Sequence, residues 1–225
     1  MQRASLFTGH QEFYGLDFIV TPDVLIPRPE TEFLVERVIK LARDLTVEAP
    51  VIADIGTGSG CIAIAVAVNL PRARVVATDV SSAALDIARR NAARHSVRGR
   101  IEFLAGDLLK PLAAAGLREA VDILASNPPY VAEETSDLLQ REVREWEPNE
   151  ALFGGLDGLD FYRRLLVDAV EFTKPRDCLV LEIGHSQLDP IAQVIDNSPW
   201  GLAHVTRDLQ GIPRTITLRK QSENC

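Results

Sequence analysis

The chain has 225 residues, of which 46% are hydrophobic, and its formal net charge is −8. This length fits one globular domain with a sizeable core and leaves little room for a second full domain. The excess of acidic residues argues against broad, nonspecific phosphate binding, which relies on clustered Lys and Arg, although it does not exclude a local basic groove.

The cysteines and the apolar segments indicate the cellular compartment of the protein. Cys61, Cys178 and Cys225 are far apart and lack a C-x-x-C spacing, so neither a disulfide framework nor a zinc site is predicted. No segment offers the roughly 18 uninterrupted apolar residues of a membrane span, and the first residues lack the apolar core of a signal peptide. We therefore expect a cytoplasmic protein with no metal and no membrane association.

The first 45 residues predict a hairpin, a loop and a helix. An aromatic segment at 13–20 has the composition of a strand or hairpin, and the Pro-rich segment around Pro27-Arg28-Pro29 predicts a rigid loop. An amphipathic pattern from about Glu30 to Leu45 predicts a helix.

From Val51 onward, short apolar runs alternate with helical patterns, which predicts an α/β fold with a parallel sheet covered by helices. Two late β-like stretches, 203–206 and 215–218, are expected to close the sheet as an antiparallel pair. The other expected elements are strands at 51–55, 74–78, 100–104, 121–125 and 178–183, helices at 61–69, 83–95, 135–144 and 159–172, and a helix after Gln187.

A glycine-rich loop follows the first parallel strand. In Asp54-Ile55-Gly56-Thr57-Gly58-Ser59-Gly60, glycine allows a sharp turn and a close approach of the backbone to a ligand, and the N–H groups of the next helix favour a negative group. Tight strand-to-helix turns also need glycine for geometry alone. Here Asp79 follows Gly60 by 19 residues, at the end of the next strand, where a carboxylate grips a ribose diol. The pattern therefore favours a nucleoside ligand.

A further acidic residue follows the third strand. Asp107 could accept a hydrogen bond from an adenine amino group, with Leu108 against the ring, or it could instead cap the next helix. Asp54 likewise has a simpler role open to it, since it could fix the glycine-rich loop by accepting backbone N–H groups.

The tetrapeptide Asn127-Pro128-Pro129-Tyr130 follows the strand expected at 121–125. An amide or aromatic-amine nitrogen has a delocalised lone pair, so an enzyme that methylates it must hold both N–H bonds and turn the lone pair toward the methyl donor. Asn127 offers a side-chain oxygen and Pro128 a backbone carbonyl, and the prolines fix φ and remove competing donors. Tyr130 offers a face for stacking. Alternatively, the turn merely ends the strand.

The tetrapeptide decides between two nucleoside cofactors. Dinucleotides and S-adenosylmethionine share the features of the first three strands, but a hydride-transfer enzyme has no need of the Asn127–Tyr130 segment at the fourth. A methyl donor held by the first three strands would point its sulfonium at the Asn127–Tyr130 segment. The sequence therefore favours S-adenosylmethionine over NAD.

The chain resembles the HemK/PrmC family of protein-(glutamine-N5) methyltransferases, which modify peptide chain release factors. The resemblance runs from Phe13 to about Leu218 and rests on VLIPRPETE at 24–32, DIGTGSGCIAI at 54–64 and SNPPYV at 126–131, with shorter matches later in the chain. It implies a Rossmann-like sheet of seven strands, mostly parallel, with an antiparallel closing strand.

The resemblance also implies a reaction and a site. The methyl group would pass from S-adenosylmethionine, leaving S-adenosylhomocysteine, to the glutamine of a Gly-Gly-Gln motif in release factors. Substrate and catalysis would fall to Asn127, Pro128, Pro129 and Tyr130, and the cofactor to Asp54, Ile55, Gly56, Thr57, Gly58, Asp79, Asp107, Leu108 and Asn127. No general base is required, and we expect no catalytic role for His10, His95, His185 or His204.

The resemblance sets the expected domain boundaries as well. Residues 1–29 are expected to pack as a hairpin and Pro-rich segment on a catalytic domain at 30–225, and the family's N-terminal helical domain is expected to be absent. Arg28 either contributes to a wall at the cofactor mouth or pairs with an acid such as Glu182, and Asp208 to Arg214 has a similarly open role. We expect Trp146 and Trp200 to be packing residues.

Two other functions stay open. Adenine-N6 methyltransferases of RNA or DNA use a closely similar tetrapeptide on an amine of the same flat geometry, but the acidic charge and the lack of room for a target-recognition domain count against them. A catalytically silent S-adenosylmethionine-binding protein would keep the fold without the reaction. We expect a monomer that acts on release factors and binds no nucleic acid directly.

Overall fold

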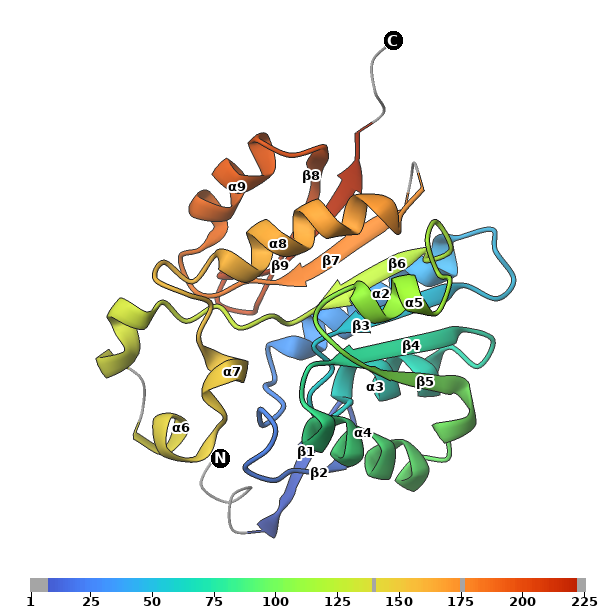
Figure 1. The fold of residues 1–225 in the computed structure, drawn as a ribbon, viewed down its shortest axis with the longest axis horizontal. Helices are drawn as coiled ribbons and strands as arrows, with labels where there is room; N and C mark the ends of the chain where they lie inside the picture. The colour runs from blue at the N-terminus through green and yellow to red at the C-terminus, as the bar shows by residue number, and fades with distance from the viewer. Residues whose placement is uncertain (1–7, 139–140, 175–176, 222–225) are drawn as a thin grey trace.

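The computed structural model describes residues 8–138, 141–174 and 177–221, and a seven-stranded sheet runs through its centre (Figure 1). The five strands β3 to β7 are parallel, and β9 is antiparallel to both of its neighbours, β7 and β8. In spatial order the strands are β5 (Ile101–Ala105), β4 (Arg74–Asp79), β3 (Val51–Ile55), β6 (Ile123–Ser126), β7 (Cys178–Glu182), β9 (Pro213–Lys220) and β8 (Trp200–Arg207). The predicted α/β sheet with an antiparallel closing strand is confirmed.

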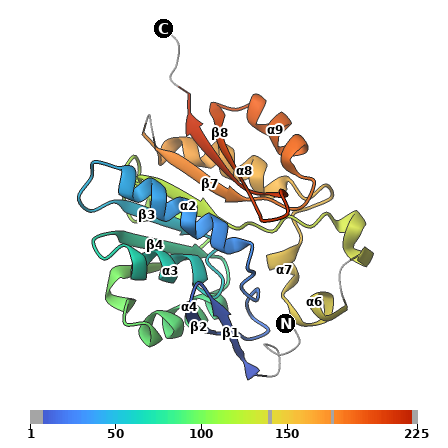
Figure 2. The same cartoon turned by 180° about the vertical axis from the view of Figure 1, so that it is seen from behind.

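Helices cover both faces of the sheet, as the front and back views show (Figures 1 and 2). One face carries α2 (Thr31–Asp44), α3 (Cys61–Asn69) and α4 (Ser82–Arg94), and the other carries α5 (Lys110–Ala114), α8 (Asp160–Asp168) and α9 (Leu188–Asp196). Strands such as β6 and β7 are therefore buried along their whole length, which is why they read as continuous apolar runs rather than as alternating ones.

The hairpin expected at 13–20 is present, as β1 (His10–Phe13) and β2 (Leu16–Ile19). Phe13 and Phe18 are buried and meet edge to face with ring centroids 6.0 Å apart. Asn91 of α4 fixes the hairpin, because its side chain accepts from the Ile19 N–H at 2.8 Å and donates to the Ile19 carbonyl at 3.0 Å. The same amide donates to the Ser59 carbonyl at 2.9 Å, so the hairpin is tied to the glycine-rich loop.

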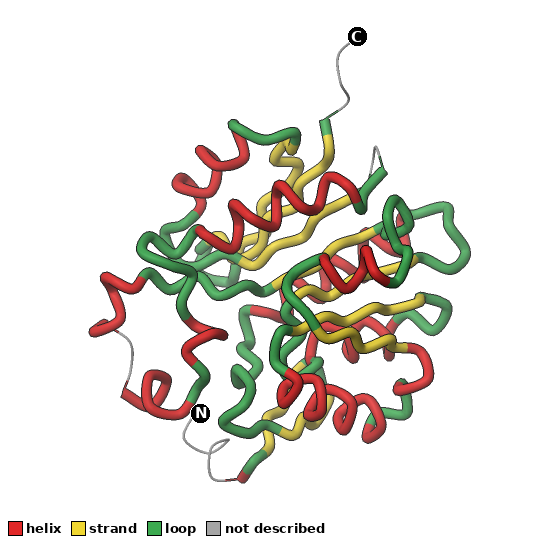
Figure 3. The backbone as a smooth tube through the Cα atoms, in the orientation of Figure 1, coloured by secondary structure: helices red, strands yellow, loops and turns green. Residues whose placement is uncertain are grey.

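The helix expected at 135–144 is wrong as a single element, as the tube in Figure 3 shows. The chain forms a 3₁₀ helix, η2 (Glu133–Leu138), and a separate helix α6 (Arg141–Trp146), while residues 139–140 lie outside the described residues. A physical reason is visible at Thr135, whose hydroxyl donates to the Ala132 carbonyl at 2.9 Å and so competes with α-helical pairing.

Three further short elements were not expected, because each is too brief to show a helical period. They are α5, α7 (Asn149–Leu152) and the 3₁₀ helix η1 (Arg98–Arg100). The helix expected at 159–172 is present as α8 followed by the 3₁₀ helix η3 (Ala169–Glu171).

The two tryptophans have different fates. Trp200 is buried, and its indole N–H donates to the Leu166 carbonyl at 2.8 Å, so its packing role is confirmed. Trp146 is 52% exposed at the end of α6, so its expected packing role is wrong.

Within the described ranges, no helix has both the length and the apolar character needed to cross a membrane.

Candidate active site

The ends of β3, β4 and β6 meet at one edge of the sheet. The N–H groups of Gly56 and Thr57 both donate to the Thr78 carbonyl at 2.9 Å, which binds the loop after β3 to the end of β4. On the other side, the Ser126 hydroxyl donates to the Ile55 carbonyl at 2.7 Å. The predicted cofactor loop and the predicted substrate tetrapeptide therefore leave the sheet side by side.

The glycines of the loop serve two distinct purposes. Gly56, Gly58 and Gly60 all have positive φ, at +72°, +54° and +83°. A Cβ atom at Gly60 would lie 2.9 Å from the Ile64 side chain and 3.0 Å from that of Ala88, so this glycine is required for packing between α3 and α4. A Cβ at Gly56 or Gly58 would meet no described atom within 4 Å. These two positions border open space that a ligand can approach.

Asp54 holds the loop through one carboxylate oxygen, while its other oxygen has no partner among the residues that the structure describes. Its Oδ2 accepts from the Thr57 hydroxyl at 2.6 Å and from the Ala63 N–H at 3.2 Å. Its Oδ1 is buried and has no hydrogen-bond partner among the described residues. Burial raises the pKa of this carboxyl to about 7. The loop-fixing role is thus present, and it leaves an acceptor for a ligand donor.

Asp79 also organises the loop. Its two carboxylate oxygens accept from the backbone N–H groups of Gly58, at 2.8 Å, and Ser81, at 2.9 Å. Burial raises the pKa of the carboxyl, and these backbone donors oppose the rise. Since each carboxylate oxygen can accept more than one hydrogen bond, the arrangement remains compatible with a ribose diol.

Asp107 and Leu108 follow β5 near the same edge. The Asp107 carboxylate pairs with Lys110 at 2.9 Å and Arg164 at 2.5 Å, and hydrogen bonding to Lys110 lowers its pKa. It does not cap α5, whose N-cap is Leu109, so the capping alternative is wrong. Leu108 is 4% exposed, and its carbonyl accepts from the Thr78 hydroxyl at 3.1 Å. Adenine contacts at both residues stay a prediction.

Asn127 has one half of its amide hydrogen-bonded, and the other half has no partner in the described part of the chain. Its Nδ2 donates to the hydroxyl of Thr31, the first residue of α2, at 3.2 Å. Its Oδ1 is buried and has no hydrogen-bond partner within the described part of the chain. A buried amide oxygen without a partner is costly and rare, and it commonly marks a group that a ligand satisfies. The atom is the one that the sequence assigns to a substrate amide.

The rest of the tetrapeptide is held in place by close backbone packing. Gln187 accepts from the Gly184 N–H and donates to the Tyr130 carbonyl, both at 2.9 Å. A Cβ at Gly158 would lie 2.3 Å from the Tyr130 carbonyl oxygen, and one at Gly154 would lie 2.5 Å from that of Pro129. Because these glycines lack a Cβ, the loop at 154–158 can pack closely against the tetrapeptide. Tyr130 itself is buried enough that the pKa of its phenol is raised.

Arg28 pairs with Glu147 rather than with Glu182. One guanidinium nitrogen, Nη2, lies 2.6 Å and 2.8 Å from the two Glu147 oxygens, while Nη1 is buried without a partner among the described residues. Glu147 is 6% exposed, so its carboxylate is buried against Arg28 although the sequence around it is rich in acidic and basic residues. The pair joins the Pro-rich loop to the segment after α6.

Removing Arg28 should destabilise the fold. Arg28→Ala leaves the buried Glu147 carboxylate without a partner, and we expect a loss of about 3 to 5 kcal/mol in the free energy of unfolding. Urea denaturation measures it. Arg72→Ala, which breaks an ion pair with Glu48 whose side chains are 75% and 82% exposed, is the matched control and should cost about 0 to 1 kcal/mol. Equal losses for the two variants would contradict the buried pairing.

Glu182, the last residue of β7, is a buried carboxyl beside the tetrapeptide. It is 2% exposed, its Oε2 has no hydrogen-bond partner among the described residues, and burial raises its pKa to about 7. A hydrogen bond from the Thr31 side chain and the charges of Arg214 and Arg28 oppose that rise, whereas Glu30 adds to it. Arg214 itself donates to Asp208 at 2.8 Å.

The pKa values near 7 of the Asp54 and Glu182 carboxyls predict how their contribution to stability depends on pH. Asp54 and Glu182 hold protons in the folded protein up to about pH 7 but ionise near pH 4 when unfolded. Their stabilising contribution is complete below about pH 4 and is lost as pH rises to about 7. Urea denaturation at about pH 5.5 and pH 7.5 should show this loss in the free energy of unfolding, roughly 2 kcal/mol per group. The Asp54→Asn variant should lack the part of the loss that comes from Asp54. An unchanged pH dependence in Asp54→Asn would refute it, and Asp86→Asn on the exposed face of α4 is the control.

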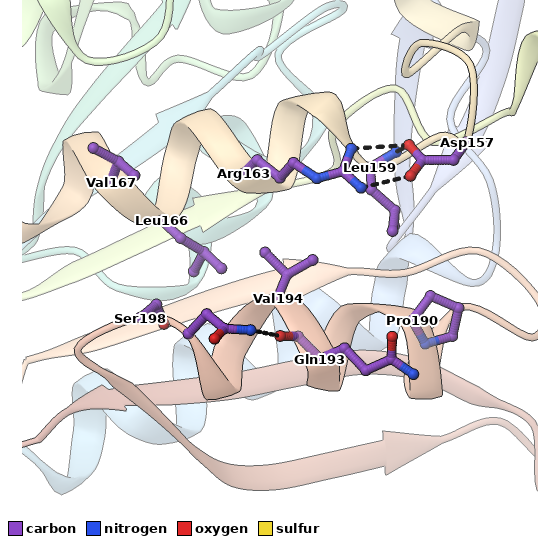
Figure 4. Close-up of a pocket in the computed structure, with 10 residues that line it drawn as sticks. Asp157, Leu159, Arg163, Leu166, Val167, Pro190, Gln193, Val194 and Ser198 are labelled. Atoms are coloured by element: carbon purple, nitrogen blue, oxygen red, sulfur yellow. Dashed lines mark hydrogen bonds and ion pairs between the residues drawn. The ribbon is translucent and has the colours of Figure 1, made fainter.

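A groove of about 580 Å³ lies between α8 and α9 (Figure 4). Arg163 points along α8 to Asp157, which it binds at 2.5 Å and 3.0 Å, and Val194 points into the groove from α9. None of the predicted site residues lines it.

The structure also brings in residues that the sequence did not single out. Thr31 and Gln187 each bind the tetrapeptide directly, and Ser126 joins the strand before it to the Ile55 carbonyl. Thr31 is separated from Asn127 by 96 residues in sequence. Thr31 lies in the VLIPRPETE segment, but nothing in that segment shows that its hydroxyl faces Asn127. Only the three-dimensional arrangement of α2, β6 and β7 reveals it.

Comparison with known proteins places this geometry among methyltransferases. Residues 30–145 match the family model described as Methyltransferase small domain. The chain is 45% identical over 218 residues to the Release factor glutamine methyltransferase of Koribacter versatilis, covering 96% of this chain and 74% of that protein. It is 42% identical to the protein of the same name from Geobacter sulfurreducens, covering 92% of this chain and 70% of that one.

Solved structures share the fold at lower identity. Ribosomal protein L11 methylase from Lactobacillus delbrueckii subsp. bulgaricus superposes with a TM-score of 0.60 and 20% identity, over 87% of this chain and 81% of that one. The hMettl16 catalytic domain in complex with MAT2A 3′UTR hairpin 6 gives 0.69 and 18% identity, over 94% and 78% of the two chains. Both likenesses concern the fold alone.

Proposed function

Because this chain belongs to the family of release factor glutamine methyltransferases, we propose that it transfers a methyl group from S-adenosylmethionine to a release-factor glutamine. The target atom is the side-chain amide nitrogen (N5) of the glutamine in the Gly-Gly-Gln motif. The single observation that carries the proposal is the buried Oδ1 of Asn127, which has no partner among the described residues and is available to accept from a substrate amide.

The residues present fit the cofactor. Open space at Gly56 and Gly58 and the unpartnered Oδ1 of Asp54 leave room and an acceptor for a nucleoside at the ends of β3 and β4. Asp54 to Gly58 would hold it with Asp79 on the ribose, Asp107 and Leu108 near the base, and Asn127 near the methyl group. When bound, S-adenosylmethionine supplies an electrophilic methyl group and leaves as S-adenosylhomocysteine.

The chain contributes orientation rather than a strong base. Asn127 accepts one amide hydrogen of the glutamine on Oδ1, and the Pro128 carbonyl accepts the other. Together they turn the nitrogen lone pair out of conjugation with the amide carbonyl. Pro129 and Tyr130 form the wall against which the planar amide lies. Positioning of this kind can lower the barrier by several kcal/mol.

The proton balance is simple. The nitrogen gains a methyl group and must lose one of its two hydrogens, and once methylated it is acidic enough to give that proton to water. The carbonyl of Pro128 and the amide of Asn127 hold the N–H groups until then. His10, His95, His185 and His204 take no part in this scheme.

The partner and the compartment follow from the substrate. A release factor is a cytoplasmic protein, and we propose that the enzyme acts there as a monomer on the folded factor, without binding nucleic acid directly. The net charge of −8 favours a protein over a nucleic-acid substrate.

The proposal is tested by offering the enzyme labelled S-adenosylmethionine with three substrates. These are a release factor, the same factor with the motif glutamine replaced by alanine, and adenine-containing RNA and DNA. We expect label in the first alone. Label in the alanine variant would show a different target residue, and label in nucleic acid would establish the adenine-N6 reaction instead.

A further inference from the structure

We propose that Thr31 and Glu182 are positioning residues for methyl transfer, which fix the amide of Asn127 with its oxygen toward the substrate. The inference rests on the proposed function, because it explains how the Asn127 oxygen is presented to the substrate. Two hydrogen bonds, from Asn127 to Thr31 and from Thr31 to Glu182, would fix the orientation of the amide; they are called the hydrogen-bonded chain below. Neither residue touches the reacting atoms in this scheme, and both act through Asn127.

Three elements converge to make the chain. Thr31 opens α2 and is 1% exposed, Asn127 follows β6, and Glu182 ends β7, which pairs with β6 in parallel register. The Asn127 Nδ2 donates to the Thr31 Oγ1 at 3.2 Å, and the Thr31 side chain forms a hydrogen bond with the Glu182 carboxyl. The threonine hydroxyl thus lies between a side-chain amide and a carboxyl.

The direction of each hydrogen bond follows from the chemistry of the groups. An ionised carboxylate can only accept, so the single proton of the Thr31 hydroxyl must point at Glu182. The hydroxyl then has only lone pairs left for Asn127, and only the NH₂ half of an amide can donate to them. The Oδ1 half is therefore forced to the opposite side, where it is buried and has no partner among the described residues.

The charge of Glu182 sets the direction of these hydrogen bonds, because only the ionised carboxylate is limited to accepting. The charged or titratable groups that act on it are Thr31's neighbour Glu30, the guanidinium groups of Arg28 and Arg214, the phenols of Tyr130 and Tyr162, and the Cys61 thiol. The two arginines favour the ionised form. Burial raises the pKa of Glu182 to about 7. The Thr31 hydroxyl should therefore donate to Glu182 above this pH and lose that fixed direction below it.

Reversal of the chain would present the wrong atom. A protonated Glu182, or a glutamine in its place, can donate to the Thr31 oxygen, and the threonine proton is then free to point at Asn127. The amide would turn over and offer its NH₂ to the substrate NH₂. Two donors would face each other, and the acceptor needed for the first amide hydrogen would be absent.

The test compares steady-state kinetics of four variants with the wild type, at saturating S-adenosylmethionine. Thr31→Val keeps the shape and removes the hydroxyl, and we expect kcat to fall about 10- to 100-fold with little change in KM for the release factor. Thr31→Ser restores the hydroxyl and should return kcat to within about threefold. Glu182→Gln should lower kcat and remove the acid limb near pH 7 from the pH profile. Thr173→Val, at a buried threonine whose hydroxyl donates to the Ala169 carbonyl, is the matched control.

A second measurement does not depend on turnover. Neutron diffraction from the perdeuterated protein locates deuterons, and we expect the two Asn127 amide deuterons on the side of Thr31 in the wild type and the hydroxyl deuteron directed at Glu182. Amide deuterons facing away from Thr31, or a Thr31→Val enzyme with wild-type kcat, would overturn the inference. A wild-type enzyme that methylates no release factor would instead overturn the proposed function, and the neutron map would still decide the direction of the chain.

Discussion

Replacing Asn127 by alanine is expected to abolish methyl transfer while leaving the fold intact. The change removes the unpartnered Oδ1, which is the proposed acceptor for one hydrogen of the substrate amide, and it removes a residue from the proposed methyl-binding region. Loss of one preorganised polar group in an active site commonly costs about 10²- to 10³-fold in kcat. Turnover of labelled S-adenosylmethionine with a release factor measures the effect.

The fold should survive because little else depends on the side chain. The alanine removes one hydrogen bond, from Nδ2 to Thr31, and an acceptor that already lacks a partner. The matched control is Asn197→Ala, at an exposed position after α9 where the amide donates to the Gln193 carbonyl. It should keep full activity. An Asn127→Ala enzyme as active as this control would rule out the proposed mechanism.

Gly58→Ala is expected to weaken S-adenosylmethionine binding by about 10- to 100-fold. Gly58 has φ of +54°, and a Cβ built on it enters the open space of the glycine-rich loop. Filling a site that a ligand occupies costs about 1 to 3 kcal/mol, and each 1.4 kcal/mol is about tenfold in affinity. Isothermal titration calorimetry measures the dissociation constant directly.

Backbone strain must be separated from the loss of space. Alanine at a positive φ costs about 1 to 2 kcal/mol of stability wherever it is placed. Gly116 has φ of +71°, and a Cβ there also meets nothing within 4 Å, but it follows α5 and belongs to none of the predicted site segments. Gly116→Ala should therefore lose similar stability and bind the cofactor normally. Equal affinities in both variants would contradict the placement of the cofactor at this loop.

Hydrophobic periodicity predicted most of the sheet, because strands buried on both faces leave a clear apolar signal. Both β3 and α3 begin and end at the residues expected from sequence. In the antiparallel closing pair, β8 begins three residues and β9 two residues earlier than expected. The signal failed between 133 and 146. There the polar sequence carries no period, and side-chain bonds such as that of Thr135 compete with the helix.

The site was partly predictable for a different reason. Backbone motifs such as the glycine-rich loop and the Asn127–Tyr130 segment have local signatures, and the structure brings the two segments to one edge of the sheet. Pairings between distant side chains have no such signature. Arg28 binds Glu147, which is 119 residues away, and the chain from Glu182 through Thr31 to Asn127 joins three separate elements. Charge and spacing alone could not select these partners from other acids nearby, since the sequence left open whether Arg28 lines the cofactor mouth or pairs with an acid such as Glu182.

The most direct measurement of the central claim is the position of the transferred methyl group. A release factor incubated with the enzyme and S-adenosylmethionine is digested, and tandem mass spectrometry of the peptide carrying the Gly-Gly-Gln motif locates the added mass. The account predicts a single methyl group on the side-chain nitrogen of that glutamine, absent when Asn127→Ala replaces the wild-type enzyme. A methyl group on any other residue of the factor, or on none, would contradict it.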